Sequence, residues 1–235
     1  MSLPIFYYHQ PVENLHQIEL DETASKHIVQ VLRMQQGEQL QLTDGRGNMH
    51  LAEIAGSNRK RCPVKILETV KHSKPAREVT IAISLIKNNS RFEWFLEKAT
   101  EIGVTAIIPI ISERTEKQHF RIERMQAILV SAMLQSKQTW LPALAEPVKY
   151  LQLINTAIDA KKMIAYCEET ENRKSIITEA PLPGHKLVLI GPEGDFTPGE
   201  IQTALANNFI PVSLGHTRLR TETAGIVAAS LLCNL

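Results

Sequence analysis

The chain has 235 residues, of which 43% are hydrophobic and 22% are charged, and its formal net charge is +1. This composition indicates an ordinary globular protein of one large domain or two domains, and it excludes disordered and fibrous proteins. No apolar run reaches the roughly 18 residues that a membrane-spanning helix requires. Residues 1–10 lack a basic region followed by an apolar core, so we expect neither a signal peptide nor membrane association.

The cysteines and histidines carry no pattern of a bound metal. Cys62, Cys167 and Cys233 stand far apart without a CxxC pair, and the histidines are scattered without ligand spacing. An odd number of isolated cysteines favours a reducing compartment over a disulfide framework. We therefore expect a cytoplasmic protein without a metal site.

The N-terminal part of the chain is composed of short segments in which apolar and polar residues alternate. Two such segments flank a glycine-rich turn at residues 44–48, which predicts a β-hairpin. The expected elements are a helix at 23–34 and strands at 39–43, 49–54 and 63–70. They predict a small β-rich barrel with one helix, followed by a linker at residues 71–78.

Beyond the linker, strand and helix patterns alternate. The expected strands are 79–86, 105–111, 163–167, 186–190 and 210–214. The expected helices begin at Ser90, Arg121, Thr197 and Thr221 and extend to Gly103, Gln138, Asn207 and Leu232. Ser90 with Glu93 has the spacing of a helix capping box, and a later helix has a strong start with Thr197 as N-cap, Pro198 at N1 and Glu200 at N3. This alternation predicts a mostly parallel sheet covered on both faces.

Two glycine-bearing loops, residues 190–196 and 214–224, each follow a strand and lead into a helix. Ligands of parallel α/β sheets bind at the carboxyl ends of strands, where glycine lets backbone amides come close. The glycines could equally serve only to make tight turns. The chain has no GxGxxG or GxxxxGK[ST] motif, and no GxSxG or HExxH motif, so a dinucleotide fold, a P-loop, an esterase and a zinc protease are unsupported.

Three segments, in this order and spacing, resemble the bacterial 16S ribosomal RNA uridine N3-methyltransferases of the SPOUT superfamily. They are residues 91–115, with the run Glu97-Lys98-Ala99-Thr100-Glu101, the Gly191-Pro192-Glu193-Gly194 loop, and residues 213–224 with Leu219-Arg220-Thr221-Glu222-Thr223-Ala224. The front segment, with residues 27–33 and Asp44-Gly45-Arg46-Gly47, is similar to the PUA-like domain of that family.

The resemblance implies a fold and an activity. The fold is a SPOUT α/β knot, a trefoil-knotted mostly parallel sheet, at residues 73–235, behind a PUA-like RNA-binding β-barrel at residues 1–72. The activity is methylation of N3 of a specific uridine in 16S rRNA of the small ribosomal subunit with S-adenosylmethionine, by a homodimer. A methyltransferase acting on another RNA, and a ribosome-assembly factor that binds RNA without catalysis, remain alternatives.

The resemblance also implies site residues. Arg220 is the candidate catalytic group, and it could instead clamp a phosphate or pair with Glu222. The cofactor would be held by Leu189, Ile190, Gly191, Glu193, Gly194, Leu214, Gly215, Leu219, Thr221, Thr223 and Ala224. Glu193 could instead cap its loop.

RNA contacts are expected on both parts of the chain. The candidates are Lys26, His27, Arg33, Arg59, Lys60, Arg61, Arg91 and Arg114. Basic side chains gather between residues 59 and 77, where they could contact phosphates or form a solvated linker. Arg91 and Arg114 could instead form structural pairs with Glu113 or Glu116.

Three positions depart from the sequence pattern of the family that the chain resembles. Asp195 replaces a frequent second glycine, Gln138 a frequent arginine, and Ile5 an arginine in the first strand. The departures put an RNA-binding or catalytic role at positions 5 and 138 in doubt, and they predict a loop of different conformational freedom at Asp195.

Overall fold

The fold is taken from a computed structural model of the chain, which describes residues 3–10, 12, 16–116, 119–167, 173–181 and 184–235. The chain divides into two compact units. The first comprises Met1–Lys74 with Met133–Leu141, and the second comprises Pro75–Ala132 with Pro142–Leu235. Among the described residues, no helix is both long and apolar enough to cross a membrane.

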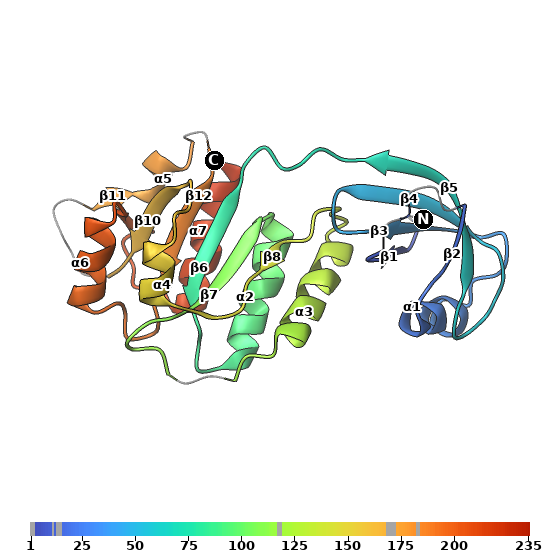
Figure 1. Cartoon of the computed structure of the whole chain (residues 1–235), viewed down its shortest axis with the longest axis horizontal. Coiled ribbons are helices and arrows are strands. Elements are labelled where there is room, and N and C mark those ends of the chain that lie inside the picture. Colours follow the sequence, from blue (N-terminus) through green and yellow to red (C-terminus); the bar gives the residue numbers. More distant parts are fainter. Residues whose placement is uncertain (1–2, 11, 13–15, 117–118, 168–172, 182–183) are drawn as a thin grey trace. The chain divides into compact units, whose positions relative to one another are not determined.

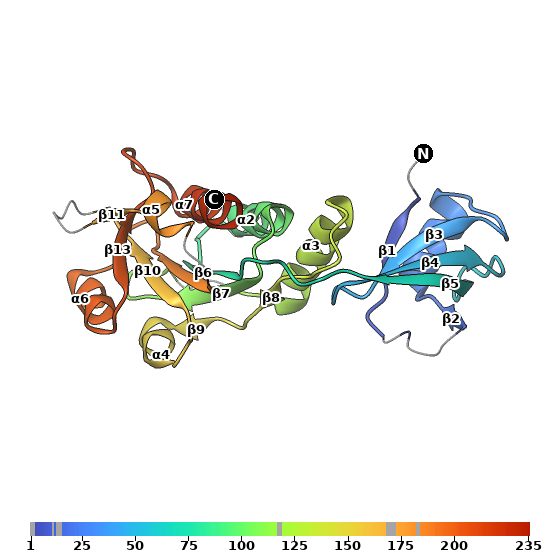
Figure 2. The same cartoon turned by 90° about the horizontal axis from the view of Figure 1, so that it is seen from above.

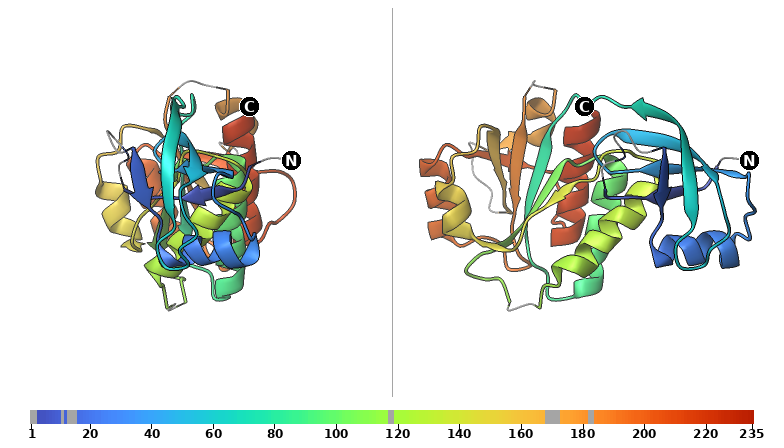
Figure 3. Two further views of the ribbon diagram at one scale, coloured as in Figure 1. Left: turned by 90° about the vertical axis from the view of Figure 1, so that its right-hand side faces the viewer. Right: turned by 45° about the vertical axis from the view of Figure 1, so that its right-hand side comes forward.

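The first unit is built on a five-stranded sheet in the order β1-β3-β4-β5-β2. Its strands are β1 (Ile5–Tyr7), β2 (Gln17–Glu19), β3 (Gln39–Thr43), β4 (Asn48–Ile54) and β5 (Pro63–Lys71). β1 pairs with β3 in parallel and the other pairs are antiparallel. The sheet curls into an open half-barrel (Figures 2 and 3), and the predicted hairpin is β3–β4.

The predicted helix of this unit is shorter than expected and changes character along its length. Asp21 caps α1 (Glu22–Lys26) by accepting a hydrogen bond from the Ala24 amide at 2.8 Å, and a π-helical turn, His27–Val31, follows. The expected end at Met34 is wrong because Arg33 has a φ of 54°, in the left-handed region, which ends the helix.

The hairpin turn at residues 44–48 is packed against the segment Met133–Leu141. Gly47 donates from its amide to the Thr139 carbonyl at 2.8 Å, and the Leu141 amide donates to the Gly45 carbonyl at 2.9 Å. The indole of Trp140 donates to the Ser73 carbonyl at 2.9 Å. These contacts place Met133–Leu141 in the first unit, which the division of the sequence at residues 72 and 73 did not anticipate.

The second unit contains an eight-stranded sheet in which every pair is parallel. The order is β11-β13-β10-β12-β6-β7-β8, with β9 also paired to β7. The strands are β6 (Val79–Ser84), β7 (Ala106–Ile111), β8 (Ala143–Leu144), β9 (Val148–Lys149), β10 (Lys161–Ala165), β11 (Lys174–Ser175), β12 (Lys186–Ile190) and β13 (Ile210–Ser213). β6 and β12 are buried at every position, as is typical of central strands in a parallel sheet that is covered on both faces.

Helices cover both faces of this sheet, which confirms the predicted arrangement of a parallel sheet between helices. They are α2 (Asn89–Ile102), α3 (Ile122–Gln135), α4 (Tyr150–Asn155), α5 (Ile176–Glu179), α6 (Pro198–Ala206) and α7 (Thr221–Asn234). Figures 1 and 2 show α2 and α7 side by side on one face and α4 and α6 on the other. Gly225 permits the close approach of α7 to α2, because a Cβ there would lie 2.6 Å from the Phe95 ring.

The helix ends follow local capping, with one correction. Thr197 is the N-cap of α6, as predicted, and it forms a capping box with Glu200. The box predicted for Ser90 and Glu93 is wrong: Asn88 is the N-cap and accepts a hydrogen bond from the Ser90 amide at 2.9 Å, while Glu93 binds Arg124. Gly103 ends α2 at a φ of 101°, as its position predicted. α3 stops at Gln135, three residues short of the expected end at 138, and Lys137 lies beyond it in the left-handed region.

Candidate functional site

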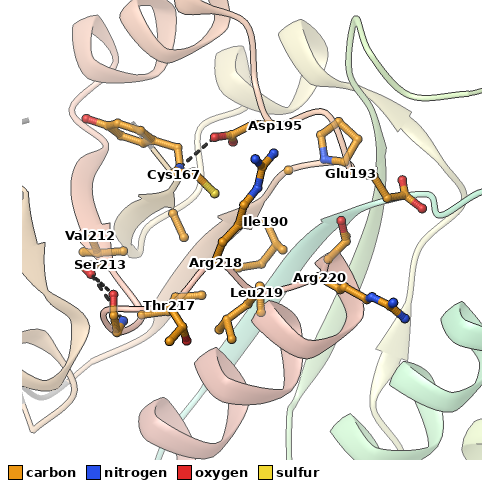
Figure 4. Close-up of a pocket in the computed structure, with 18 of the residues that line it drawn as sticks. Cys167, Ile190, Glu193, Asp195, Val212, Ser213, Thr217, Arg218, Leu219 and Arg220 are labelled. Carbon is orange, nitrogen blue, oxygen red and sulfur yellow. Dashed lines mark hydrogen bonds between the residues drawn. The ribbon is translucent and has the colours of Figure 1, made fainter. Parts of the chain in front are cut away.

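A pocket of about 630 Å³ lies where the chain leaves the carboxyl ends of β10, β12 and β13. The loop after β12 and the loop after β13 form most of it, and the end of β10 closes one side (Figure 4). Its lining residues are Ala165, Tyr166, Cys167, Arg173, Ile190, Gly191, Pro192, Glu193, Asp195, Val212, Ser213, Leu214, Gly215, His216, Thr217, Arg218, Leu219, Arg220, Thr221 and Ala224.

The Asp195 carboxylate fastens the loop after β12 to the end of β10. One oxygen accepts a hydrogen bond from the Phe196 amide at 2.8 Å and the other accepts from the Cys167 amide at 2.7 Å. Asp195 has a φ of 63°, an uncommon conformation for a residue with a side chain. Gly191 faces Asp195 and the Phe196 ring, and a Cβ at Gly191 would be 3.2 to 3.3 Å from both. The loop is therefore held in one conformation by its acidic residue.

The loop after β13 bends at His216 and Thr217, directly after Gly215. Gly215 has a φ of 151°, and the Ser213 hydroxyl donates to the Gly215 carbonyl at 2.9 Å and accepts from the Gly215 amide at 3.3 Å. The loop then reaches Arg220, whose extended backbone forms the N-cap position of α7. Figure 4 shows Arg218 extending toward Asp195 and Cys167, whereas Arg220 points away from them.

The pocket combines an apolar wall with charges of both signs. Ile190, Val212, Leu214 and Leu219 contribute apolar surface, and Glu193 and Asp195 contribute carboxylates. Burial, and then the Asp195 carboxylate, raise the pKa of the Cys167 thiol, and Arg218 and Arg173 oppose this shift. The thiol therefore stays protonated at neutral pH, which argues against Cys167 as a nucleophile.

A turn after β7 braces the loop after β12. The Arg114 guanidinium donates to the Gly194 carbonyl at 2.6 Å, and the Glu113 amide donates to the Glu200 carboxylate at 2.8 Å. The Thr115 hydroxyl lies 2.6 Å from the Ser84 hydroxyl at the end of β6. The turn after β7 is thereby bonded to the loop after β12, to α6 and to the end of β6.

The structure gathers most of the predicted cofactor residues in this pocket. Of the predicted set, Ile190, Gly191, Glu193, Leu214, Gly215, Leu219, Thr221 and Ala224 line it, as does Arg220. Leu189, Gly194 and Thr223 are absent from its lining as far as the described chain shows. Leu189 is fully buried in the core, and Gly194 faces Arg114. Sequence reasoning missed Cys167 and Arg173, although the position of a third strand end could have indicated them.

The predicted RNA-binding residues are distributed over both units. Arg91 lies 3.7 Å from the Glu222 carboxylate and Arg114 binds Gly194, so neither forms the pair with Glu113 or Glu116 that the sequence left open. In the first unit, Lys26 pairs with Glu22 at 2.7 Å and Arg61 lies 3.7 Å from Glu19. His27 packs edge-on against Phe6, and Arg33, Arg59 and Lys60 are exposed. Within the described chain, no cluster of His, Cys, Asp or Glu could hold a metal ion.

A family model described as an RNA methyltransferase domain matches residues 72–233, which include all of the pocket-bearing unit except its last two residues. The chain belongs to this RNA methyltransferase family. An RNA methyltransferase PUA domain matches residues 20–67. These matches confirm the family inferred from the motifs and the PUA-like fold of the N-terminal unit.

Relatives of this RNA methyltransferase match most or nearly all of its chain. A Synechocystis protein named ribosomal RNA small subunit methyltransferase E is 34% identical over 88% of this chain and 69% of its own. A probable rRNA methyltransferase of Porphyromonas gingivalis is 42% identical, with a TM-score of 0.89 over 97% of this chain and 95% of that one. The Neisseria gonorrhoeae ribosomal RNA small subunit methyltransferase E, solved with S-adenosyl methionine, is 29% identical, with a TM-score of 0.86 over 97% and 96% of the two chains.

Proposed function

We propose that the protein methylates N3 of a uridine in 16S rRNA of the small ribosomal subunit, with S-adenosylmethionine as methyl donor. The observation that carries this proposal is the pocket built by the two motif loops of an RNA methyltransferase. The relatives named ribosomal RNA small subunit methyltransferase E support the choice of small-subunit ribosomal RNA as the substrate. The choice of uridine N3 rests on the resemblance of the three motifs.

The residues of the pocket fit this cofactor. The pocket's volume of about 630 Å³ suits a small organic ligand. Ile190, Leu214 and Leu219 offer an apolar surface for the adenine, and the Gly191 and Gly215 backbones come close without side chains. The Glu193 and Asp195 carboxylates match the positive charges of the sulfonium and the amino group. We assign binding to the predicted set, with Leu189, Gly194 and Thr223 acting through the backbone or the shape of the loops.

Positioning explains much of the proposed chemistry. S-adenosylmethionine supplies an electrophilic methyl group, so the protein must align the acceptor atom and exclude water. Uracil N3 loses a proton as it attacks, and the Arg220 guanidinium at the pocket edge would stabilise the anion. Arg220 is therefore the proposed catalytic residue.

The rest of the assembly follows from the same proposal. Residues 1–72 are the RNA-binding domain, which would contact phosphates through Lys26, His27, Arg33, Arg59, Lys60 and Arg61. Residues 73–235 are the catalytic domain, with a C-terminal trefoil knot formed around the loops at 190–196 and 214–224. The enzyme would work as a cytoplasmic homodimer.

The test is restoration of a single methyl group. Small subunits from cells that lack the gene are incubated with the purified protein and S-adenosylmethionine, and nuclease fragments of the RNA are analysed by mass spectrometry. We expect one 3-methyluridine to appear. If no base of the RNA gains a methyl group while calorimetry still detects cofactor binding, the target is another RNA; if the cofactor does not bind either, the protein is a non-catalytic RNA-binding factor.

Asp195 gives a second test, directed at the cofactor pocket. We expect Asp195→Gly to weaken S-adenosylmethionine binding about 30-fold, because it removes both hydrogen bonds that hold the loop, each of which contributes about 1 kcal/mol. Asp195→Asn should weaken it only about fivefold, because asparagine tolerates the left-handed backbone and keeps one of the two acceptors, so that one bond of about 1 kcal/mol is lost. Isothermal titration calorimetry measures both affinities. Equal affinities in the glycine variant and the wild type would contradict this role.

A further inference from the structure

A second hollow of about 290 Å³ lies between the beginnings of α2 and α3. Its lining residues are Asn89, Ser90, Glu93, His119, Arg121, Arg124 and Met125. α2 follows the carboxyl end of β6, and α3 follows that of β7, so the hollow opens at the same edge of the sheet as the cofactor pocket. Figure 1 shows α2, α3 and α7 rising from this edge. We call it the α2–α3 pocket.

The half-buried Phe120 and the buried Met125 shape the α2–α3 pocket. The Phe120 ring packs edge-on against Phe92, with ring centroids 6.2 Å apart, and Met125 is buried beneath the hollow. This anchors the chain between His119 and Arg121, both of which are exposed and line the hollow. The polar wall is therefore presented by a fixed segment of backbone.

The charges of the α2–α3 pocket leave one cation unmatched. Arg124 holds Glu93 in a two-pronged ion pair, with Nε–Oε1 and Nη2–Oε2 distances of 2.5 and 2.9 Å. Hydrogen bonds from Arg124 hold the pKa of the Glu93 carboxyl below its usual value, so this carboxylate is ionised and neutralised by Arg124. Within the described chain, the Arg121 side chain has no hydrogen bond or ion pair. Arg121 therefore remains free to bind an anion.

The arginines expected to bind RNA in this unit have other partners. Arg91 lies 3.7 Å from the Glu222 carboxylate in the first turn of α7, and Arg114 donates to the Gly194 carbonyl in the loop after β12. Arginine binds phosphate well because its planar donors match the phosphate oxygens. The Ser90 hydroxyl and the Asn89 amide add neutral donors to the same hollow.

We propose that the α2–α3 pocket binds a backbone phosphate of the RNA substrate through Arg121, next to the nucleotide that enters the cofactor pocket. This inference rests on the proposed function and extends it to a substrate contact outside the reaction centre. The phosphate would fix the register of the RNA and carry no sequence information.

The experiment measures RNA affinity as a function of salt. Wild type, Arg121→Ala and Arg121→Lys are titrated with an unmodified transcript of small-subunit rRNA over a range of potassium chloride concentrations. Each phosphate contact adds about one to the slope of log affinity against log salt. We expect Arg121→Ala to lower the slope by about one and the affinity at low salt about tenfold, and Arg121→Lys to retain the slope.

Lys98→Ala is the matched control, because Lys98 lies toward the other end of α2, where it pairs with Glu97 and Glu101. It also removes one positive charge, and we expect no change of slope. Calorimetry with S-adenosylmethionine should give the wild-type affinity for all variants, since none of these residues lines the cofactor pocket.

The outcomes separate the two proposals. Suppose that the wild type methylates the RNA. If Arg121→Ala then keeps the wild-type slope, or if Lys98→Ala lowers the slope as much as Arg121→Ala does, the phosphate site is wrong and the proposed function stands. If the wild type transfers no methyl group to any RNA and binds none, both fail. A change of sedimentation in Arg121→Ala without a change of RNA affinity would identify a protein contact and overturn the phosphate site.

Discussion

Replacing Arg220 with alanine is expected to slow methyl transfer about 100- to 1,000-fold while cofactor affinity stays within about twofold. The magnitude is that of losing one preorganised donor to a developing negative charge. Arg220 lies at the pocket edge, is exposed and has no hydrogen bond or ion pair from its side chain to other described residues. Truncation should therefore leave the fold and the cofactor contacts intact.

Single-turnover methylation of undermethylated small subunits measures this effect, with cofactor affinity determined by calorimetry. Higher pH should restore part of the rate of the alanine variant, because hydroxide helps to remove the N3 proton. Arg220→Lys should lose less than Arg220→Ala, because it keeps the charge but not the planar donor set. Added guanidinium ion should also recover some of the alanine variant's activity.

A different pattern would assign Arg220 to RNA binding. If Arg220→Ala has the wild-type single-turnover rate at saturating RNA and only a raised KM, the residue acts as a phosphate clamp. Loss of an ion pair between Arg220 and Glu222, which the sequence left open, would not explain either result, because Glu222 has Arg91 as its neighbour at 3.7 Å.

Much of the fold could be predicted because its elements carry strong periodic signals. The buried runs of β6 and β12 and the capping of α6 by Thr197 are local patterns, and they appear where they were expected. The two-residue strands β8, β9 and β11 and the helices α4 and α5, of six and four residues, were not predicted because each is too short to show the period of its own type. The end of the first helix was misplaced because nothing in the sequence indicates that Arg33 adopts a positive φ.

The site was predictable in its loops but not in its connections. The glycines and the position of each loop after a strand indicated the two main walls of the pocket. The third wall, at Cys167, carries no motif, and its bond to Asp195 joins residues 28 apart in the chain. The bond from Arg114 to Gly194 spans 80 residues. Such contacts depend on the folded arrangement of strands, so a pattern of neighbouring residues cannot reveal them.

Gly47→Ala is expected to lower the free energy of unfolding of the first unit by about 2–4 kcal/mol. Gly47 has a φ of 94°, which costs an alanine more than about 1 kcal/mol. A Cβ at Gly47 would lie 2.5 Å from the Trp140 ring and 2.8 Å from the His72 carbonyl, and overpacking of this kind costs about 1–3 kcal/mol. Urea unfolding followed by circular dichroism measures the loss.

Gly37→Ala isolates the backbone contribution. Gly37 lies in the same unit at a φ of 90°, with no atom within 4 Å of its added Cβ, so it should lose only the smaller amount of about 1 kcal/mol. In the double variant Gly47→Ala with Trp140→Leu, the ring clash is removed while the clash with the His72 carbonyl stays, so Gly47→Ala should cost less than in the wild type. Equal losses at Gly37 and Gly47 would mean that the turn at residues 44–48 does not depend on close packing against Trp140, and that backbone strain alone sets its preference for glycine.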